Sequence, residues 1–414
     1  RLAGAGVGPV KIRVLGAGFA GVRAALDLDR LLGRQGVDIS IINKDPYHEL
    51  TTEIYRPAAG RDVRVLAVPL EDIFAGTSVA VVQGTVTDIR LRERQVVLDR
   101  QRILKFDRLV VALGSEPEYF SIPGLRENSL TLKSLNSAEN IRRHIDAMLS
   151  QAAALANPAD RQPFATVIIA GAGLTGVELA GELADQRPVL ARRHGLVPEE
   201  IRIITVEAAP DILPGFDDAL IEAATDMLMR KGVSLILGTP LRAVEPGAVV
   251  LEDGTRIAAR TIIWSGGVRA NRLIEKCFTT RNRGRAVVNE YLQSVDDPTV
   301  YIIGDAALAI NTRTGQPVAP TAQHAVQQGR LAARNIWAEL KGRPLRAYRA
   351  RTIGVLATVG HDVGLAHIGP IKLFGRFPVV VKDLNTWRYI LSLGGTRLLL
   401  KVLWRNGRLR WARA

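Results

Sequence analysis

Two glycine-rich loops constrain this chain more than any other feature, because each follows an apolar strand and precedes a helical pattern. They occupy residues 10–21 and 166–176. In each G-x-G-x-x-G loop the first glycine makes a tight turn, the second lets a phosphate approach the backbone, and the third lets helix and strand pack closely. The phosphates then lie at the positive N-terminus of the helix. Further strands are predicted at 37–43 and 201–207, so the sequence predicts two βαβ units that bind two dinucleotides.

The spacing of these units sets the expected domain organisation, since 414 residues suffice for about two to three domains. We expect an α/β protein with two Rossmann-like dinucleotide-binding domains, one inserted in the other. The first covers 9–128 and resumes at 289–345, and the second covers 129–288. Residues 346–414 are expected to form a C-terminal region with helices that associate with a membrane. The basic segment 186–200 is expected to be a surface loop.

Composition excludes several kinds of site and raises one question about partners. Cys277 is the only cysteine, which excludes an intramolecular disulfide, a cysteine-pair redox centre and a cysteine-based metal site. His48 and His324 lack neighbouring ligands at metal-binding spacing, so no metal site is expected. No apolar run reaches the ~18 residues that would span a bilayer. The net charge of +14 favours nucleic acid, an anionic membrane or anionic ligands as partners.

Half of that net charge lies after residue 386, where seven basic residues and no acidic one occur: Arg388, Arg397, Lys401, Arg405, Arg408, Arg410 and Arg413. Gly394-Gly395 is expected to divide this segment into two helices. In the second helix Arg397, Lys401 and Arg405 share one face, while a different face carries Leu398, Leu399, Val402 and Leu403.

Three of the five tryptophans also fall in this segment, at Trp387, Trp404 and Trp411. A basic face, an apolar face and tryptophans are typical of a helix that lies in an anionic membrane surface. The alternative is a helix packed on the protein or at a dimer interface. Nucleic-acid binding is not expected, because no base-reading module accompanies the charge. Truncation after Asp383 is expected to abolish membrane binding and to leave both glycine-rich loops intact.

The residue at the end of the second strand of each βαβ unit reads ribose hydroxyls. Glu207 occupies this position in the second domain, and no basic residue follows it directly. A carboxylate there accepts hydrogen bonds from a ribose 2′-hydroxyl and repels a 2′-phosphate, which predicts NADH rather than NADPH. The corresponding residue in the first domain is Asn43, followed by Lys44. Asn43 departs from the usual acidic residue but retains hydrogen-bonding capacity toward a ribose.

The whole arrangement resembles the flavoproteins with two dinucleotide-binding domains, on the segments 16–21, 109–115, 171–178 and 301–307. Within that superfamily the chain is similar to type II NADH dehydrogenases, the single-subunit NADH:quinone oxidoreductases, on the segments 47–53, 212–216 and 320–329. The resemblance implies FAD in the first domain and NADH in the second. It also implies a homodimer on the cytoplasmic face of a bacterial cell membrane, acting in a respiratory chain.

The resemblance further assigns roles to individual residues. Glu178 is the implied catalytic residue at the contact between nicotinamide and flavin; the alternative is a charge that only stabilises the helix start. Gln323 and Gln327 are implied to bind quinone, against the alternative of a polar helix face. The residues implied to bind FAD or NADH are Gly16, Ala17, Gly18, Phe19, Ala20, Gly21, Asn43, Lys44, Val86, Gly114, Gly171, Gly173, Gly176, Glu207, Gly304, Asp305, Ala322, Gln323 and Lys382.

The activity implied is hydride transfer from NADH to FAD, followed by two-electron reduction of a membrane quinone without proton pumping. Sulfide:quinone oxidoreductases and disulfide reductases share the architecture but need a cysteine pair, which a lone Cys277 does not supply. Two alternatives stay open from the sequence. One is an FAD-dependent NADH reductase of a soluble electron-carrier protein, and the other is a flavin-based redox sensor.

Overall fold

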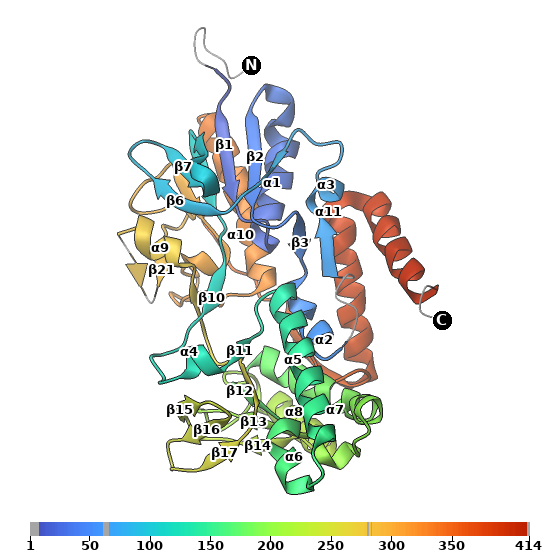
Figure 1. Ribbon diagram of the computed structural model, residues 1–414. Helices are drawn as coiled ribbons and strands as arrows, with labels where there is room; N and C mark the ends of the chain where they lie inside the picture. The colour runs from blue at the N-terminus through green and yellow to red at the C-terminus, as the bar shows by residue number, and fades with distance from the viewer. Residues whose placement is uncertain (1–7, 61–65, 280, 283, 412–414) are drawn as a thin grey trace.

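The computed structural model describes residues 8–60, 66–279, 281–282 and 284–411, without the side chains of 282 and 406–411. Figure 1 shows two α/β bodies stacked along the long axis of the molecule, with the last helix, α11, running beside both. The predictions for the side chains of Arg408, Arg410, Trp411 and Arg413 lie outside the described residues.

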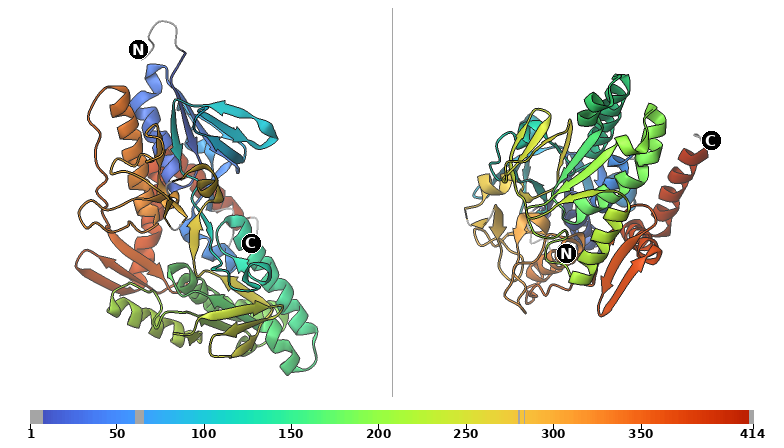
Figure 2. Two further views of the ribbon diagram at one scale, coloured as in Figure 1. Left: turned by 90° about the vertical axis from the view of Figure 1, so that its left-hand side faces the viewer. Right: turned by 90° about the horizontal axis from the view of Figure 1, so that it is seen from below.

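The first body contains a five-stranded parallel sheet in the order β22-β9-β1-β2-β5. Its strands are β22 (Val300–Ile302), β9 (Arg108–Val111), β1 (Lys11–Leu15), β2 (Asp38–Asn43) and β5 (Ala80–Gln83). Helices α1 (Phe19–Leu32) and α10 (Ala322–Leu340) pack against each other beside this sheet, as Figure 2 shows. An antiparallel sheet of β6 (Val86–Arg90), β7 (Gln95–Leu98) and β8 (Ile103–Lys105) completes the body.

The second body repeats the parallel arrangement in the order β11-β18-β12-β13-β14. Its strands are β11 (Leu130–Thr131), β18 (Thr261–Trp264), β12 (Thr166–Ala170), β13 (Arg202–Val206) and β14 (Ser234–Ile236). Around it lie α4 (Leu125–Asn128), α5 (Leu135–Ala154), α6 (Pro158–Ala165), α7 (Leu174–His194), α8 (Asp218–Arg230) and the antiparallel strands β15 (Leu241–Glu245), β16 (Ala248–Leu251) and β17 (Arg256–Ala258). The expected α/β architecture with parallel sheets is therefore confirmed.

One expectation for this body is wrong. The segment 186–200 is not a surface loop, because α7 continues through it to His194 and a short 3-10 turn follows at Pro198–Glu200. Pro188 lies inside the helix.

The two bodies are joined by β10 (Ser115–Pro117) and β19 (Val268–Ala270), which pair antiparallel. Smaller elements cover the first body: β3 (Tyr47–Glu49), α2 (Tyr55–Ala58), β4 (Ala67–Pro69), α3 (Leu70–Ile73), α9 (Arg272–Cys277), β20 (Arg281–Asn282), β21 (Arg285–Val287) and β23 (Ala307–Leu308).

The C-terminal region differs from the expected purely helical one. It begins with an antiparallel sheet of β24 (Gly354–Thr358), β25 (Gly364–Ile368) and β26 (Ile371–Gly375), which lies beside α8 of the second body (Figure 2). Helix α11 (Arg376–Trp411) follows, and Gly394 and Gly395 leave helical geometry within it. The expected division at these two glycines is confirmed, since Gly395 adopts a φ of 67° that favours glycine.

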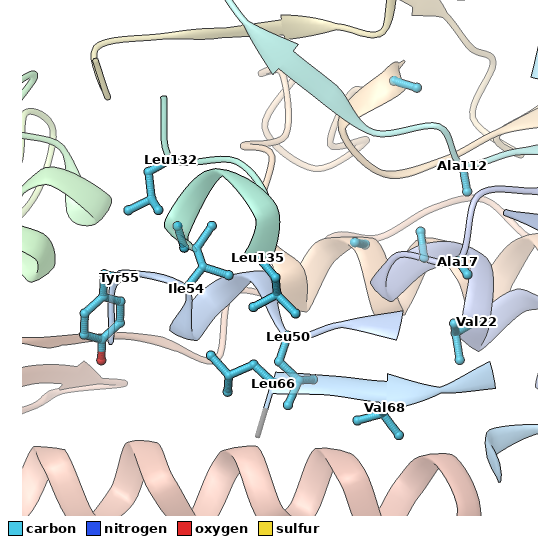
Figure 3. Packing of buried hydrophobic residues seen from close by; sticks show 14 of the residues in the cluster. Ala17, Val22, Leu50, Ile54, Tyr55, Leu66, Val68, Ala112, Leu132 and Leu135 are labelled. Atoms are coloured by element: carbon cyan, nitrogen blue, oxygen red, sulfur yellow. The ribbon is translucent and has the colours of Figure 1, made fainter. Parts of the chain in front are cut away.

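The apolar core continues from the first sheet into the space between α5 and α11. Figure 3 shows Leu50, Ile54, Leu66 and Leu135 packed there, and the hydroxyl of Tyr55 points toward the helix of α11. Ile390, Leu393, Leu398 and Val402 of α11 belong to the same buried cluster. Helix α11 is thus part of the core and not an appended tail.

Candidate functional site

The first glycine-rich loop has the shape that a dinucleotide phosphate requires. Gly16 has a φ of +95°, and a Cβ there would lie 2.3 Å from the carbonyl oxygen of Ala112. A Cβ at Gly21 would lie 1.9 Å from the carbonyl oxygen of Gly16, so helix α1 approaches the turn closely. A Cβ at Gly18 would meet nothing within 4 Å. The loop is therefore tight on its protein side and open at the second glycine, where a phosphate would approach.

Side chains hold this loop at Ala17. Its backbone N–H donates to Oδ1 of Asn43 at 3.0 Å, and its carbonyl accepts from Nδ1 of His48 at 2.7 Å. The amide nitrogen of Asn43 donates to the carbonyl of Asp45 at 2.9 Å. Asn43 thus supports the loop, and its contact with a ribose stays a prediction. Lys44 is 67% exposed and lies 3.8 Å from a carboxylate oxygen of Asp45.

The second loop repeats this construction. Gly171 has a φ of +109°, and a Cβ at Gly176 would lie 2.0 Å from the carbonyl oxygen of Gly171. A Cβ at Gly173 would meet nothing within 4 Å. Glu207 holds the loop through Oε2, which accepts from the N–H of Ala172 at 2.6 Å, while Oε1 accepts from the N–H of Ala209 at 2.9 Å. The carboxylate of Glu207, which is predicted to select NADH, is therefore held beside the second glycine-rich loop.

The carboxyl ends of β9 and β22 bring a second group of predicted residues to the first loop. Gly304 packs against Ala20, since a Cβ at Gly304 would lie 3.3 Å from that of Ala20. Asp305 accepts from the hydroxyl of Ser115 at 2.7 Å, and Ser115 accepts from Nζ of Lys133 at 3.0 Å. Burial lowers the pKa of Lys133. Both glycines at these strand ends, Gly114 and Gly304, have positive φ values of 68° and 69°.

Val86 begins β6 next to the end of β2. It is half-buried, and the neighbouring Gly84 donates its N–H to the carbonyl of Asn43 at 2.9 Å. Its predicted contact with the cofactor stays a prediction.

Glu178 lies in a buried network that joins α2, α7, β24 and α11. Its Oε1 accepts from the backbone N–H of Thr358 at 3.1 Å and from Nζ of Lys382. Nζ of Lys382 also lies 3.7 Å from Oε1 of Glu53 and 3.1 Å from the hydroxyl of Tyr55. Glu178, Glu53 and Tyr55 are at most 4% exposed. The structure thus joins Glu178 to Lys382, two residues that the sequence analysis assigned separately.

The two buried carboxylates of this network, Glu178 and Glu53, each have a cation nearby. Arg56 pairs with Glu53 at 3.2 Å and with Asp383 at 2.9 Å. Burial raises the pKa of Glu178, and Lys382 acts against that shift. Burial acts to lower the pKa of Lys382, but Glu178, Tyr55 and Glu53 together outweigh it and the pKa is raised. Burial, with the carboxylate of Glu178, raises the pKa of Tyr55 to about 12.

Sequence reasoning missed Glu53, Tyr55, Arg56 and Thr358 as members of this network. The one available signal was a pair of opposite charges, Glu53 and Arg56, three residues apart. The sequence gives no such signal for the contact of Tyr55 with Thr358, because these two residues are 303 positions apart.

Gln323 and Gln327 project from the first turns of α10 onto one segment. The amide of Gln323 donates to the carbonyl of Gly354 at 3.2 Å and accepts from the N–H of Ile353 at 3.0 Å. The amide of Gln327 pairs with both backbone groups of Arg351, at 2.8 and 3.0 Å. Both glutamines therefore position the strand that follows, and their contacts with flavin or quinone stay predictions.

Ala322 begins α10, capped by Thr321, and His324 follows in the first turn. His324 is buried, its Nδ1 lies 3.0 Å from the carbonyl oxygen of Ala319, and it lines a small pocket with Gly304 and Asp305. The neighbouring Gln328 accepts from the N–H of Gly304 at 2.7 Å, which links α10 to the strand end that carries Asp305.

Strand β24 connects the predicted catalytic residue, Glu178, with Gln323, which is predicted to bind flavin and quinone. Gln323 contacts its first residue, Gly354, and Glu178 contacts its last, Thr358. Four residues of extended strand span ~13 Å.

The predicted division of α11 into a basic face and a lipid-facing apolar face is wrong in part. Leu398 and Val402 are buried in the core. Lys401 and Arg405 both pair with Asp72 of α3, the latter at 3.1 Å. Leu403 and Trp404 are exposed as predicted, and the other large exposed apolar residues among the described side chains of α11 are Phe377, Val380, Leu384, Leu391 and Leu400. Within the described part of the chain, no helix is long and apolar enough to span a bilayer.

Comparison with known proteins places this geometry in a family. Residues 10–329 match the family model for pyridine nucleotide-disulphide oxidoreductases. The type II NADH:quinone oxidoreductases of Staphylococcus saprophyticus and Staphylococcus aureus are each 32% identical over 395 residues, covering 94% of this chain and 98% of each relative.

Solved structures agree in fold. NDH2 from Plasmodium falciparum in complex with NADH has a TM-score of 0.84 and 17% identity, over 95% of this chain and 97% of that one. The sulfide:quinone oxidoreductase of Aquifex aeolicus has a TM-score of 0.76 and 19% identity, over 93% and 91% of the two chains. At these identities the structural likeness shows a shared fold.

Proposed function

Because this chain belongs to the type II NADH:quinone oxidoreductases, within the pyridine nucleotide-disulphide oxidoreductase family, we propose that it oxidises NADH and reduces a membrane quinone to quinol through FAD. The observation that carries the proposal is the pair of glycine-rich loops, one in each body, with both second glycines open to a ligand. FAD, when bound, accepts a hydride and returns the two electrons to a second substrate, which is chemistry that amino-acid side chains do not supply.

We assign the dinucleotides to the two bodies as follows. The loop of Gly16, Gly18 and Gly21 holds the FAD pyrophosphate at the N-terminus of α1, and Asp305 accepts hydrogen bonds from the ribityl chain. The loop of Gly171, Gly173 and Gly176 holds NADH at the N-terminus of α7. Glu207, already fixed by two backbone N–H groups, accepts from the ribose 2′-hydroxyl and excludes a 2′-phosphate.

Glu178 and Lys382 act at the nicotinamide side. Their contact through Oε1 and Nζ keeps one exchangeable proton in a site that excludes water, because both side chains are less than 10% exposed. Glu178 thereby orients the reacting groups, and its Oε1 can take up a proton from Nζ of Lys382. Gln323 and Gln327 act at the opposite end of β24, where their amides contact the backbone of residues 351–354.

The quinone is expected to enter from a membrane surface that α11 contacts. The exposed apolar residues of α11 support this part of the proposal, and the basic residues Arg388 and Arg397 add attraction to anionic headgroups. A cytoplasmic-face location and a homodimer are also proposed, and sedimentation equilibrium without lipid measures the latter.

Absorbance of the purified protein tests the central proposal. We expect a flavin band that NADH bleaches without oxygen and that a short-chain quinone restores. A protein that lacks the band, or whose band NADH does not bleach, would contradict it. Restoration by a soluble electron-carrier protein but not by quinone would favour the soluble-carrier reductase instead.

A further inference from the structure

The peptide group between Ala17 and Gly18 is held from one side. His48 donates to the carbonyl of Ala17 at 2.7 Å, and no peptide bond among the described residues is cis. In a planar trans peptide the C=O and the following N–H point in opposite directions. The contact with His48 therefore turns the N–H of Gly18 away from His48, and a Cβ on Gly18 would meet nothing within 4 Å.

His48 is itself positioned by the C-terminal helix. Its Nε2 lies 3.1 Å from the hydroxyl of Tyr389 in α11. Since a carbonyl oxygen only accepts, Nδ1 carries the proton, Nε2 of the neutral ring is an acceptor, and the Tyr389 hydroxyl donates to it. Burial lowers the pKa of His48 to about 4 and raises that of Tyr389, so both stay neutral near neutral pH. Phe19 of the loop packs on both rings, at centroid distances of 5.2 and 4.9 Å.

The second loop supplies an internal comparison. Its equivalent carbonyl, on Ala172, accepts from the backbone N–H of Leu213 at 2.8 Å. Leu213 lies in the same body as that loop, so this support needs neither a side chain nor α11. The first loop differs, because its equivalent support is a side chain whose second hydrogen bond comes from a residue 341 positions away.

We propose that Tyr389 and His48 are positioning residues that hold the first glycine-rich loop ready for FAD, so that FAD retention depends on the contact of Tyr389 in α11 with His48, whereas the second glycine-rich loop needs no such contact. This inference rests on the proposed function for the identity of the cofactor. Through His48, the contact of Tyr389 links helix α11 to the loop proposed to hold the FAD pyrophosphate.

The decisive variant is Tyr389→Phe, which removes one hydroxyl and keeps the ring against Phe19. FAD release from the purified holoenzyme is followed after dilution by the rise in free-FAD fluorescence, and folding is followed separately by circular dichroism. We expect release to be about fivefold to tenfold faster, the loss typical of one buried hydrogen bond. The dependence of flavin bleaching on NADH concentration should be unchanged.

Tyr301→Phe is the matched control. Tyr301 is fully buried in the first body, and its hydroxyl contacts Glu339 at 3.2 Å and Gln293 at 3.3 Å, away from the loop. The same atom is thus removed from a comparable environment. We expect its FAD release rate to equal that of the unmodified protein.

A double-mutant cycle with His48→Phe separates a relay from a general structural effect. If Tyr389 acts through His48, removing its hydroxyl in the His48→Phe background should cause no further acceleration. If His48→Phe does not fold, the comparison of the FAD release rates of Tyr389→Phe and Tyr301→Phe still tests whether the Tyr389 hydroxyl is needed for FAD retention.

Equal release rates for the unmodified protein and Tyr389→Phe would overturn the inference, as would an undiminished effect of Tyr389→Phe in the His48→Phe background. These outcomes leave the proposed function standing, because FAD is still bound and reduced. A purified protein that binds no FAD would contradict the proposed function itself.

Discussion

Glu207 shows how one side chain serves both loop structure and cofactor choice. It accepts from two backbone N–H groups and keeps its negative charge beside the predicted ribose site. Glu207→Gln removes the charge that repels a 2′-phosphate and replaces one acceptor oxygen by a donor. We expect the preference for NADH over NADPH, measured as the ratio of kcat/KM values, to narrow by about tenfold, or about 1.4 kcal/mol. Equal use of both cofactors by the unmodified protein would contradict the role of Glu207.

The role of Glu178 is also tested by a glutamate-to-glutamine substitution. Glu178→Gln keeps an oxygen for Lys382 and Thr358 but holds no exchangeable carboxyl proton. We expect flavin reduction by NADH to slow by about 10- to 100-fold, with FAD retained, in stopped-flow absorbance.

Glu182→Gln is the control, because Glu182 is 1% exposed, lies one turn later on α7 and pairs with His361 at 3.1 Å outside the network. An unchanged rate in Glu178→Gln, or an equal loss in Glu182→Gln, would argue for a purely structural role.

His48 makes stability depend on pH. Its pKa is about 4 when buried, against 6.5 in the absence of burial. Between these values the unfolded chain binds a proton that the folded chain does not, so stability falls as pH drops from 6.5 toward 4. The full difference is on the order of 3 kcal/mol.

The Tm of the unmodified protein should therefore fall more steeply between pH 7 and pH 5 than the Tm of His48→Phe. Parallel pH profiles would show that His48 does not carry this dependence.

The sequence predicted the residues whose roles depend on local chemistry, and it missed those whose partners are remote. Both glycine-rich loops and Glu207 follow from turns and strand ends that lie close together in sequence. The contact of Lys382 with Glu178 joins residues 204 positions apart, and the contact of Tyr389 with His48 spans 341. Spacing within a motif carries no information about such pairs, so only the fold reveals them.

At the scale of elements, α11 shows why an amphipathic pattern alone did not identify the exposed face. The helix has apolar residues on more than one side, and periodicity does not say which side faces the core. The structure buries Leu398 and Val402 and exposes Phe377, Val380 and Leu384, which follow at helical spacings of three and four. The residues proposed to face a membrane are therefore assigned from exposure.

Leu384→Glu tests this exposed face. Leu384 is 61% exposed, and a carboxylate in its place opposes both insertion into lipid and attraction to anionic headgroups. We expect binding to anionic liposomes to weaken by about tenfold or more in co-sedimentation, since burying one leucine is worth about 1.5–3 kcal/mol.

Asn385→Glu adds the same charge at the next exposed position, off the apolar stripe, and should weaken binding less. Equal binding by the two variants would show that Leu384 does not insert.

At the scale of the whole molecule, α11 cannot be removed without damage to the core. Truncation after Asp383 deletes Ile390, Leu393, Leu398 and Val402, each at most 7% exposed. It also removes Tyr389 and the backbone carbonyl of Ser392, to which Arg23 of α1 donates at 3.2 Å. The expectation that truncation spares the first loop is therefore revised.

We now expect the truncated chain to lose FAD and to unfold at least several degrees lower, because each buried leucine lost costs about 2–5 kcal/mol. Thermal unfolding and the flavin content after gel filtration measure both effects. A truncated protein that retains stoichiometric FAD and its original Tm would show that α11 is an independent appendage.

The nesting of one body in the other also sets the order in which the two nucleotide sites are completed during synthesis. All five strands of the inserted sheet lie between residues 130 and 264, so that sheet has every partner once this stretch has left the ribosome. The outer sheet is complete only after β22 (Val300–Ile302) has been synthesised. The side-chain support of its glycine-rich loop is complete only after Tyr389 has been synthesised. The loop proposed to hold NADH therefore has its sheet and its supports early in synthesis, whereas the loop proposed to hold FAD has them only near the end of translation.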